Sequence, residues 1–298
     1  MKPSQFLELL LLAAIWGSSF LFMRVGSPEL GPMLFSGIRT LIASIFLVSC
    51  IKFMRPVFNL QQIAWHMFIV GQINTAIPFV LFGYATLTLA AGTTSVLNAT
   101  TPMFGAIVAY VWLKDKLSLT AIGGLVLGFI GVYILVADQL AIDSTALLPA
   151  LAAITAAFCY GISANYTKQY LTNVKPLVLA AGSQISATIT LLPLSLFFLP
   201  EQMPSWPAIS SVIMIGVLCT GIAYIIFFRL ITALGPARAI TVTYLIPVFG
   251  LFWGVIFLHE TITVNMLLGC AVILLGVAIT TGLLKLKLTK KSPSSDQI

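Results

Sequence analysis

Charged residues are scarce in this sequence. They make up 8% of its 298 residues, whereas 59% are hydrophobic. An ordinary soluble domain carries roughly a quarter charged residues, so water cannot be the main solvent of this chain. The apolar runs are long enough to cross a hydrocarbon core of about 30 Å, which requires about 20 residues of helix. Because lipid offers the backbone no hydrogen-bond partners, such runs form helices or the strands of a closed barrel. The short alternating segments of a barrel are not seen in the sequence, so we predict helices throughout.

Residues that bind metals or catalyse reactions are also few. The chain has four cysteines and two histidines. His259-Glu260 begins the His-Glu-x-x-His motif of zinc proteases, but Thr263 stands where the second histidine belongs. The cysteines lie within apolar runs without metal-ligand or disulfide spacing, and we interpret them as small core residues: Cys50, Cys159, Cys219 and Cys270. The sequence therefore predicts no metal, no cofactor and no enzyme activity.

Ten apolar runs predict an all-α membrane protein with ten transmembrane helices. Short polar or proline-rich connections separate the runs and leave no room for a soluble domain, so the function must lie in the membrane. The predicted spans are 6–25, 32–52, 63–87, 93–113, 119–137, 147–170, 177–199, 209–231, 237–258 and 264–284.

The net charge of +7 comes from basic residues that sit singly in short connections and in the C-terminal tail. We interpret them as topology signals and predict no nucleic-acid partner, because cytoplasmic loops carry the excess of Lys and Arg. Alternate connections lie on opposite sides of the membrane. Of the basic residues outside the second span, Arg24 lies on one side and all the others lie on the other. Both termini are therefore expected in the cytoplasm. The basic side takes Lys2, Lys52, Arg55, Lys114, Lys116, Lys168, Lys175, Arg229, Arg238, Lys285, Lys287, Lys290 and Lys291.

The second half of the chain repeats the first. A shift of 145 residues superposes Pro102 on Pro247 and Asp115 on Glu260, and a shift of 144 superposes Trp16 on Tyr160. Each copy holds five spans, an odd number, so the second copy must enter the membrane from the opposite side. Transporters use such inverted repeats to alternate access to a site near the midplane. The predicted units are residues 1–140, residues 145–284 and a basic cytoplasmic tail, 285–298.

Four stretches carry a family resemblance. They are Trp16-Gly17-Ser18-Ser19-Phe20, the second span with Arg39, Leu234-Gly235-Pro236-Ala237-Arg238-Ala239, and Pro247-Val248-Phe249-Gly250 with Leu258-His259-Glu260. Together they resemble the EamA-type transporters of the drug/metabolite transporter superfamily, over essentially the whole chain. The resemblance implies two EamA repeats with ten helices, a bacterial inner-membrane location and export of amino acids or related metabolites.

Three prolines lie near the middles of predicted spans: Pro78, Pro102 and Pro247. In a helix, the proline ring removes a hydrogen bond and frees the carbonyl four residues back. Irregular backbone at membrane depth is tolerated where it packs against protein or lines a wet cavity. We predict helix kinks with a part in gating; kinks that only shape packing are the alternative. The freed carbonyls belong to Asn74, Asn98 and Thr243.

Aromatic and amide side chains at the same depth predict a binding cavity between the repeats. Trp and Tyr usually favour the membrane interfaces, but these lie nearer the middle of their spans. Together they offer surfaces for an apolar group and a few hydrogen bonds. The predicted substrate-binding residues are Trp16, Asn74, Asn98, Tyr160, Tyr224 and Tyr244.

Arg39 is the only basic residue well inside a predicted span. An unpaired charge there costs at least about 2.5 kcal/mol, so the guanidinium must find partners. A substrate carboxylate is one candidate, and carbonyls or polar side chains of neighbouring helices are the other. We favour the second, structural role.

These features predict a secondary transporter for a small neutral or zwitterionic metabolite with an apolar or aromatic part. Sugar phosphates would require several basic residues in the spans, and hydrophobic cations would require a carboxylate at mid-membrane depth. A membrane-embedded enzyme and a non-transporting sensory or structural membrane protein are the alternatives. The predicted partners are the small-molecule substrate and the lipid bilayer, and the sequence leaves monomer and homodimer both open.

Overall fold

The computed structural model describes residues 3–54 and 60–284, and this part of the chain is helical, with no strand. Lys2, Arg55 and the predicted tail 285–298 lie outside the described residues. The first half contains α1 (Pro3–Leu30), α2 (Pro32–Met54), α3 (Leu60–Gly71), η1 (Gln72–Ala76), α4 (Ile77–Thr88), α5 (Ala91–Asn98), α6 (Thr101–Val108), η2 (Ala109–Leu113) and α7 (Leu119–Ile142). The second half contains η3 (Ser144–Ala146), α8 (Leu147–Tyr170), α9 (Pro176–Ser195), η4 (Leu196–Phe198), α10 (Trp206–Met214), η5 (Ile215–Ile222), α11 (Ala223–Leu234), α12 (Pro236–Ala239), η6 (Ile240–Tyr244), α13 (Ile246–Leu258) and α14 (Val264–Thr280).

Within the described residues, 8 helical segments are long and apolar enough to cross a membrane. They correspond to the first eight predicted spans. The last two apolar helices, α13 and α14, are shorter. The ninth predicted span is not continuous, because α12 and the 3₁₀ segment η6 precede α13. The fold class is therefore all-α, with eight full-length segments and two shorter helices.

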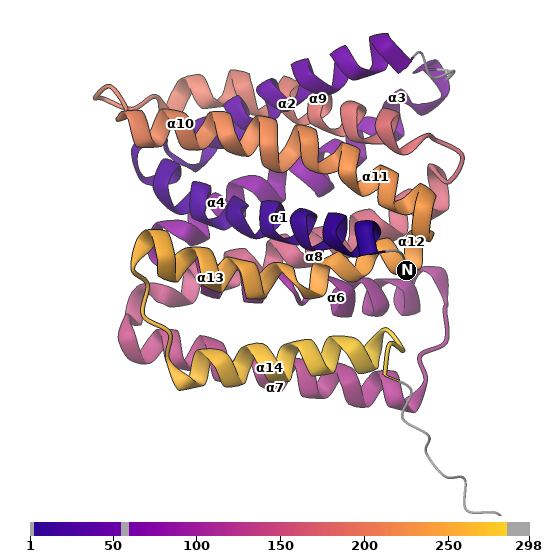
Figure 1. Ribbon diagram of the computed structural model, residues 1–298, viewed down its shortest axis with the longest axis vertical. Coiled ribbons are helices and arrows are strands. Elements are labelled where there is room, and N and C mark those ends of the chain that lie inside the picture. The colour runs from indigo at the N-terminus through magenta and orange to yellow at the C-terminus, as the bar shows by residue number, and fades with distance from the viewer. Residues whose placement is uncertain (1–2, 55–59, 285–298) are drawn as a thin grey trace, which may run out of the picture.

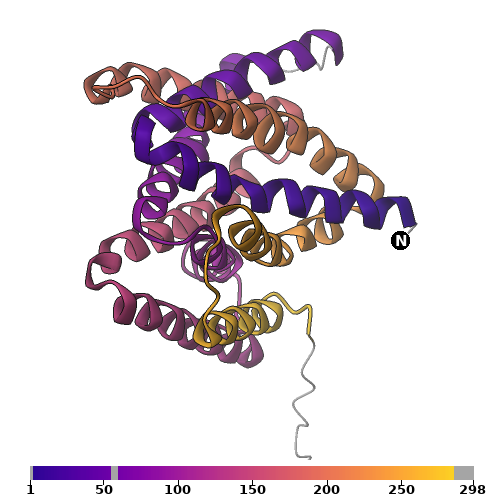
Figure 2. The ribbon, with the colours of Figure 1, turned by 60° about the vertical axis from the view of Figure 1, so that its left-hand side comes forward.

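The helices run roughly side by side in one direction across the view of Figure 1. The α7–α14 pair lies at one end of the molecule, and α2, α9 and α10 lie toward the other. Between them, α1 packs against α13, and α8 packs against α4 and α6. Figure 2 shows the same order from a second direction.

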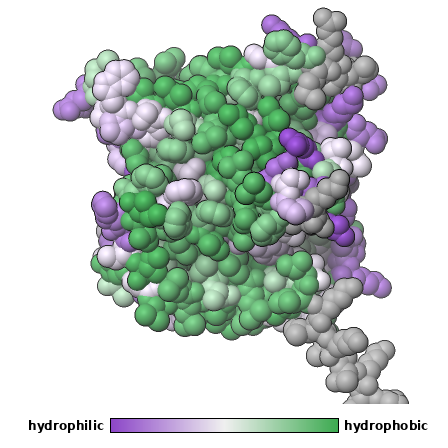
Figure 3. Space-filling model, viewed as in Figure 1, coloured by the Kyte–Doolittle hydropathy of each residue, from purple (hydrophilic) through white to green (hydrophobic). Residues whose placement is uncertain are grey.

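The surface has the distribution expected of a protein in a bilayer. Hydrophobic side chains cover the middle of the molecule, and hydrophilic ones gather at the two edges where the helices end (Figure 3). Large exposed apolar residues such as Phe53, Trp65, Tyr133 and Phe197 contribute to this surface. A helix that is apolar on every side must be covered by protein or lipid.

Glycines allow close approach at two equivalent helix crossings, each of which joins the two halves. A Cβ added to Gly17 of α1 would lie 2.7 Å from the Phe249 Cβ of α13, and one added to Gly161 of α8 would lie 2.7 Å from the Gly105 nitrogen of α6. Gly17 and Gly161 are 144 residues apart, so the two crossings are related by the repeat. This geometry is consistent with an architecture of two EamA repeats.

Candidate functional site: a cavity between the two halves

Two π-helical turns interrupt equivalent segments of the chain. The first, η1 (Gln72–Ala76), separates α3 from α4, and its end is marked by an Ile77 N–H that donates to the Gln72 carbonyl five residues back. The second, η5 (Ile215–Ile222), separates α10 from α11. A shift of 145 carries 72–76 onto 217–221, within η5. Such turns occur often at functional sites because they displace side chains from regular helical positions.

The three predicted prolines each stand at the start of a helical segment. Pro102 and Pro247 occupy the first turn of α6 and α13, each after a turn, where a missing N–H removes no helical hydrogen bond. Pro78 occupies the first turn of α4, which continues directly from the π-helical turn η1. The helix break before Pro102 leaves the Asn98 carbonyl available, and the Thr101 hydroxyl donates to it at 2.8 Å. The prolines therefore coincide with changes in helix course. Their part in gating stays a prediction.

A cavity of about 460 Å³ lies where these interruptions face one another. Its walls come from α1, α2, α8 and α9 and from the broken segments around η1, Pro102, η5 and η6. Its aromatic lining residues are Trp16, Phe20, Phe79, Phe82, Tyr160, Tyr224, Phe227 and Phe228. Its polar and charged lining residues are Ser19, Arg39, Asn74, Asn98, Thr101, Thr167, Ser183, Cys219, Thr220 and Thr243.

Many lining residues are repeat partners of one another. The two members of each pair are 144 or 145 positions apart in the sequence. Equivalent positions of the two repeats therefore line the same cavity. The pairs are Trp16/Tyr160, Phe20/Ala164, Met23/Thr167, Arg39/Ser183, Asn74/Cys219, Phe79/Tyr224, Phe82/Phe227, Asn98/Thr243 and Thr101/Ile246.

Five of the six residues predicted to bind substrate lie on the wall of this cavity: Trp16, Asn74, Asn98, Tyr160 and Tyr224. The Trp16 ring meets the Tyr224 ring edge to face at 6.4 Å. The Asn74 side chain interacts with the Tyr224 hydroxyl. The Asn98 Oδ1 atom is buried and has no hydrogen-bond partner within the described residues. Aromatic surfaces and amide groups are thus gathered at one place.

Tyr244, the sixth, does not line the cavity. Its hydroxyl lies 2.7 Å from Thr281 Oγ1, near the end of α14. The preceding residue, Thr243, faces the cavity instead. Because neighbouring residues of a helical turn point about 100° apart or more, one position along the chain decides which of them faces the site.

Arg39 also belongs to the cavity wall. It is 7% exposed, its Nε–H donates to Thr220 Oγ1 at 3.1 Å, and its guanidinium carbon lies 3.5 Å from the centre of the Phe79 ring. These contacts hold the side chain between α2, α4 and η5.

The cavity reaches one end of the helices only. Its lining extends to Thr167, Pro176 and Ile240, where α8 ends and where α9 and η6 begin. α12, which leads into η6, lies at the same end of the molecule as the start of α1 in Figure 1. Toward the other end lie Phe20 and Met23. They are the repeat partners of Ala164 and Thr167, and their side chains are larger.

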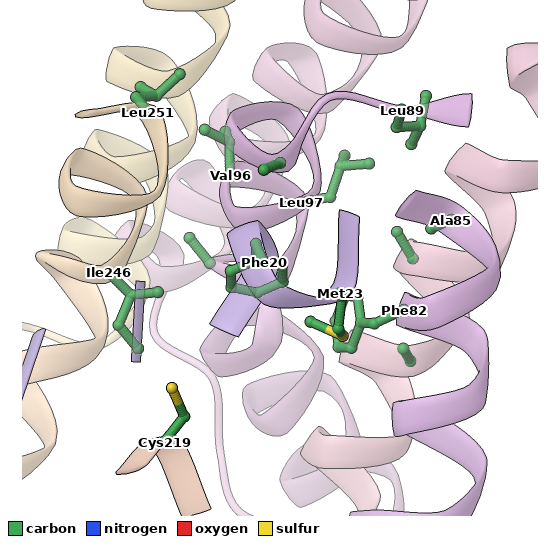
Figure 4. Close-up of a cluster of buried hydrophobic side chains, with 14 of the residues drawn as sticks. Phe20, Met23, Phe82, Ala85, Leu89, Val96, Leu97, Cys219, Ile246 and Leu251 are labelled. Carbon is green, nitrogen blue, oxygen red and sulfur yellow. The ribbon is translucent and has the colours of Figure 1, made fainter. Parts of the chain in front are cut away.

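Apolar side chains close that other end. The rings of Phe20 and Phe82 meet at 5.7 Å in an edge-to-face contact. Met23 lies beside Phe82, with Ala85 and Leu89 further along the same segment (Figure 4). All five are at most 4% exposed. They form a packed layer between the cavity and this face.

Two charged residues bind the helix ends beyond this layer. Arg24 donates from Nη1 to the carbonyl oxygens of Thr86 and Leu87, at 2.6 and 2.7 Å, at the end of α4. The Glu260 carboxylate accepts from the N–H groups of Ala91 and Gly92, at 2.7 and 3.2 Å, at the start of α5. Each charge is opposite in sign to the dipole of the helix end that it contacts, which stabilises the connection between α4 and α5.

Sequence reasoning missed several lining residues, among them Phe79, Phe227 and Thr220. The repeat itself carried the signal for Phe79, since Phe79 is the partner of the predicted residue Tyr224 at a shift of 145.

Comparison with known proteins places the chain among transporters. The model of the EamA-like transporter family matches it twice, over residues 5–137 and 147–282. The chain is 28% identical to the "Uncharacterized transporter YoaV" of Bacillus subtilis, covering 90% of this chain and 93% of that one. It is 23% identical to a "Probable amino-acid metabolite efflux pump" of Escherichia coli, covering 91% and 92% of the two chains.

Two further comparisons extend this picture. The chain is 27% identical to a "Probable terminal-alkyne amino-acid exporter" of Streptantibioticus cattleyicolor, over 93% of both chains. A solved structure superposes with a TM-score of 0.66 at 18% identity, covering 95% of this chain and 98% of the other. That likeness concerns the fold alone.

Proposed function

This chain belongs to the EamA-like transporter family, and from that premise we propose that it exports a small neutral or zwitterionic metabolite. The cargo is an amino acid or a related compound, carried by alternating access between two inverted repeats. The observation that carries the proposal is the cavity whose walls come from both repeats and contain aromatic and amide side chains. Its volume of about 460 Å³ lies in the range of small-molecule sites, roughly 300–1,000 Å³.

The composition of the wall supports this class of cargo. Trp16, Tyr160 and Tyr224 offer flat surfaces to an apolar or aromatic group. Asn74 and Asn98 offer hydrogen bonds, and one basic side chain is present rather than the several that a phosphate requires. The names of two relatives, an amino-acid metabolite efflux pump and an amino-acid exporter, agree with a cargo of this kind.

The two ends of the cavity support alternating access. One end is reached by the lining, whereas the other is covered by packed apolar side chains and by the contacts of Arg24 and Glu260. A transporter must hold one end closed while the other is open, and exchange of conformations between two similar halves reverses the arrangement. We propose that the open end faces the cytoplasm, because basic residues gather there.

We further propose that the protein resides in the inner membrane of a bacterial cell with both termini in the cytoplasm. A cysteine at Asp115 should then resist a membrane-impermeant maleimide in whole cells, while one at Ala141 should react. Both side chains are exposed, so accessibility of the position itself does not limit either reaction. The reverse pattern would contradict the proposed orientation. The same result at both positions would contradict the inverted repeat, because the span between them would then not cross the membrane.

The family description and the relatives' names point to a transporter rather than an enzyme. The direct test is counterflow in proteoliposomes with radiolabelled amino acids and amines. Accumulation of at least one labelled amino acid against its unlabelled pool is the expected result. Absence of counterflow for every amino acid and amine, with well-folded protein, would contradict the proposed cargo.

A further inference from the structure

Arg39 carries an unneutralised charge in the cavity. It is the only charged residue among those that line the cavity within the described chain. The ion pairs found in the described part join Lys168 to Asp115 and Arg229 to Glu8, so no carboxylate there is paired with Arg39. A cation at membrane depth without an anion is costly, and such residues commonly mark the path of a substrate or ion.

The contacts that Arg39 makes hold its position without neutralising it. The Nε–H is used by Thr220 at 3.1 Å, and one face of the guanidinium lies on the Phe79 ring. Within the described residues, the hydrogen bond to Thr220 is the one that the guanidinium makes. The two terminal nitrogens therefore remain available for the bidentate contact that arginine makes with a carboxylate.

The cavity also offers an acceptor without a donor. Asn98 Oδ1 is buried, lines the same cavity and has no hydrogen-bond partner in the described part of the chain. A buried acceptor left unpaired costs about 1–3 kcal/mol. An ammonium group supplies N–H donors that satisfy it, and aromatic side chains that line the same cavity offer faces that favour a cation.

We propose that Arg39 binds the carboxylate of the cargo and that Asn98 accepts from its ammonium group, so that the transporter selects free amino acids over their amides and amines. This inference rests on the proposed function and narrows it to a carboxylate-bearing cargo. The repeat partner of Arg39 is Ser183, so the charge lies on one side of the pseudo-symmetric cavity and fixes the direction of the bound molecule.

Competition in the counterflow assay tests this selectivity in the unmodified protein. Labelled phenylalanine and leucine are each competed with the free amino acid, its amide, the corresponding amine and the acid that lacks the amino group. We expect the amide and the amine to compete roughly tenfold to a hundredfold more weakly than the amino acid, as for loss of a charge-assisted hydrogen bond. The acid that lacks the amino group should also compete more weakly, because Asn98 loses its donor.

Three variants assign the effect to Arg39. Arg39→Gln should remove the preference for the free amino acid over its amide, and Arg39→Lys should keep part of it. Arg229→Gln is the matched control, because Arg229 lies outside the cavity with its side chain 73% exposed, and it should keep the full preference.

The possible failures are distinguishable. Counterflow of amino acids with equal competition by acid and amide would overturn the role of Arg39 and leave the proposed function standing. Retention of the preference in a folded Arg39→Gln protein would do the same. If Arg39→Gln does not fold, the competition series in the unmodified protein and in Arg39→Lys still decides. Counterflow of amines but of no amino acid would likewise overturn the role of Arg39 alone. No counterflow of any amino acid or amine would overturn the proposed function itself.

Discussion

Asp115 and Glu260 occupy equivalent positions in the two halves but have different partners. Each follows a residue with left-handed backbone, Lys114 at φ 59° and His259 at φ 53°. Each donates its N–H to the carbonyl six residues back, at 3.1 Å in both cases. The Glu260 side chain binds the start of α5, whereas the Asp115 side chain pairs with Lys168 at 3.2 Å.

Two basic residues, Lys168 and Arg24, likewise occupy equivalent positions in the two halves and have different partners. Lys168 is the repeat equivalent of Arg24, and Arg24 binds the end of α4. At the closed end of the cavity, the acid and the base therefore bind the ends of two successive helices. At the open end, the equivalent acid and base bind each other, with side chains 54% and 65% exposed.

Removing the charge of Glu260 should loosen the closed end. Glu260→Gln keeps the shape of the side chain but loses the attraction to the start of α5, about 1–2 kcal/mol for a partly buried site. A cysteine replacing the buried Leu89 should then react roughly 5–30-fold faster with a maleimide, in a background without the native cysteines. Asp115→Asn is the control and should leave this rate unchanged. An unchanged rate in Glu260→Gln would show that the contact does not hold the end closed.

Asp115 should approach the start of α12 when the open end closes. A shift of 145 places Ala91 and Gly92, which Glu260 binds, on Pro236 and Ala237. Arg238 is the next residue of α12. A disulfide between cysteines at positions 115 and 238 is therefore expected to form and to stop counterflow, and reduction of the disulfide should restore counterflow. Complete disulfide formation with full counterflow would refute the exchange of contacts between the two ends.

Asn98→Leu should weaken transport while leaving the fold intact. The Asn98 Oδ1 atom has no partner in the described structure, so its removal leaves no other group unsatisfied. The Thr101 hydroxyl contacts the backbone carbonyl of Asn98, which the substitution keeps. Counterflow per folded molecule should fall at least about tenfold, with an unchanged profile in detergent size-exclusion chromatography.

Tyr244→Phe should lower stability and leave transport intact, the opposite of Asn98→Leu. It removes the hydrogen bond to Thr281, which contributes about 1 kcal/mol to stability, and it leaves the cavity wall unchanged. A modestly lower thermal midpoint with normal counterflow is expected. If Tyr244→Phe lost transport and Asn98→Leu kept it, the assignment of the cavity wall would be reversed.

Gly276→Ala should destabilise the packing of α14 on α7. A Cβ at this position would lie 2.4 Å from the Gly128 nitrogen, and the backbone offers no flexible group to give way. Overpacking of this kind typically costs about 1–3 kcal/mol. Gly123→Ala is the matched control on α7, since a Cβ there meets nothing within 4 Å. The thermal midpoint in detergent should fall for Gly276→Ala and stay or rise for Gly123→Ala.

The helical spans could be predicted from the sequence because their physical cause is local. A run of about 20 apolar residues in lipid must pair its backbone groups within the run, whatever the rest of the chain does. The helix breaks before Pro102 and Pro247 were predictable for the same reason, since proline lacks a donor. The ninth span is interrupted more than the prediction allowed, with α12 and η6 standing where a continuous helix was expected.

The direction in which each side chain points was decided by tertiary packing. These helices are apolar on nearly every side, so the pattern of residues does not identify the face turned toward the cavity. Depth in the membrane was sufficient to propose Trp16, Asn98 and Tyr160 for the site, because it depends only on position along a span. Depth alone could not predict that Thr243 rather than Tyr244 faces the cavity, or that Arg39 points into it. Those directions depend on the rotation of each helix about its axis, which the neighbouring helices fix. The contact of Glu260 with α5 likewise joins residues 168 positions or more apart, and only the packed arrangement of both halves brings them together.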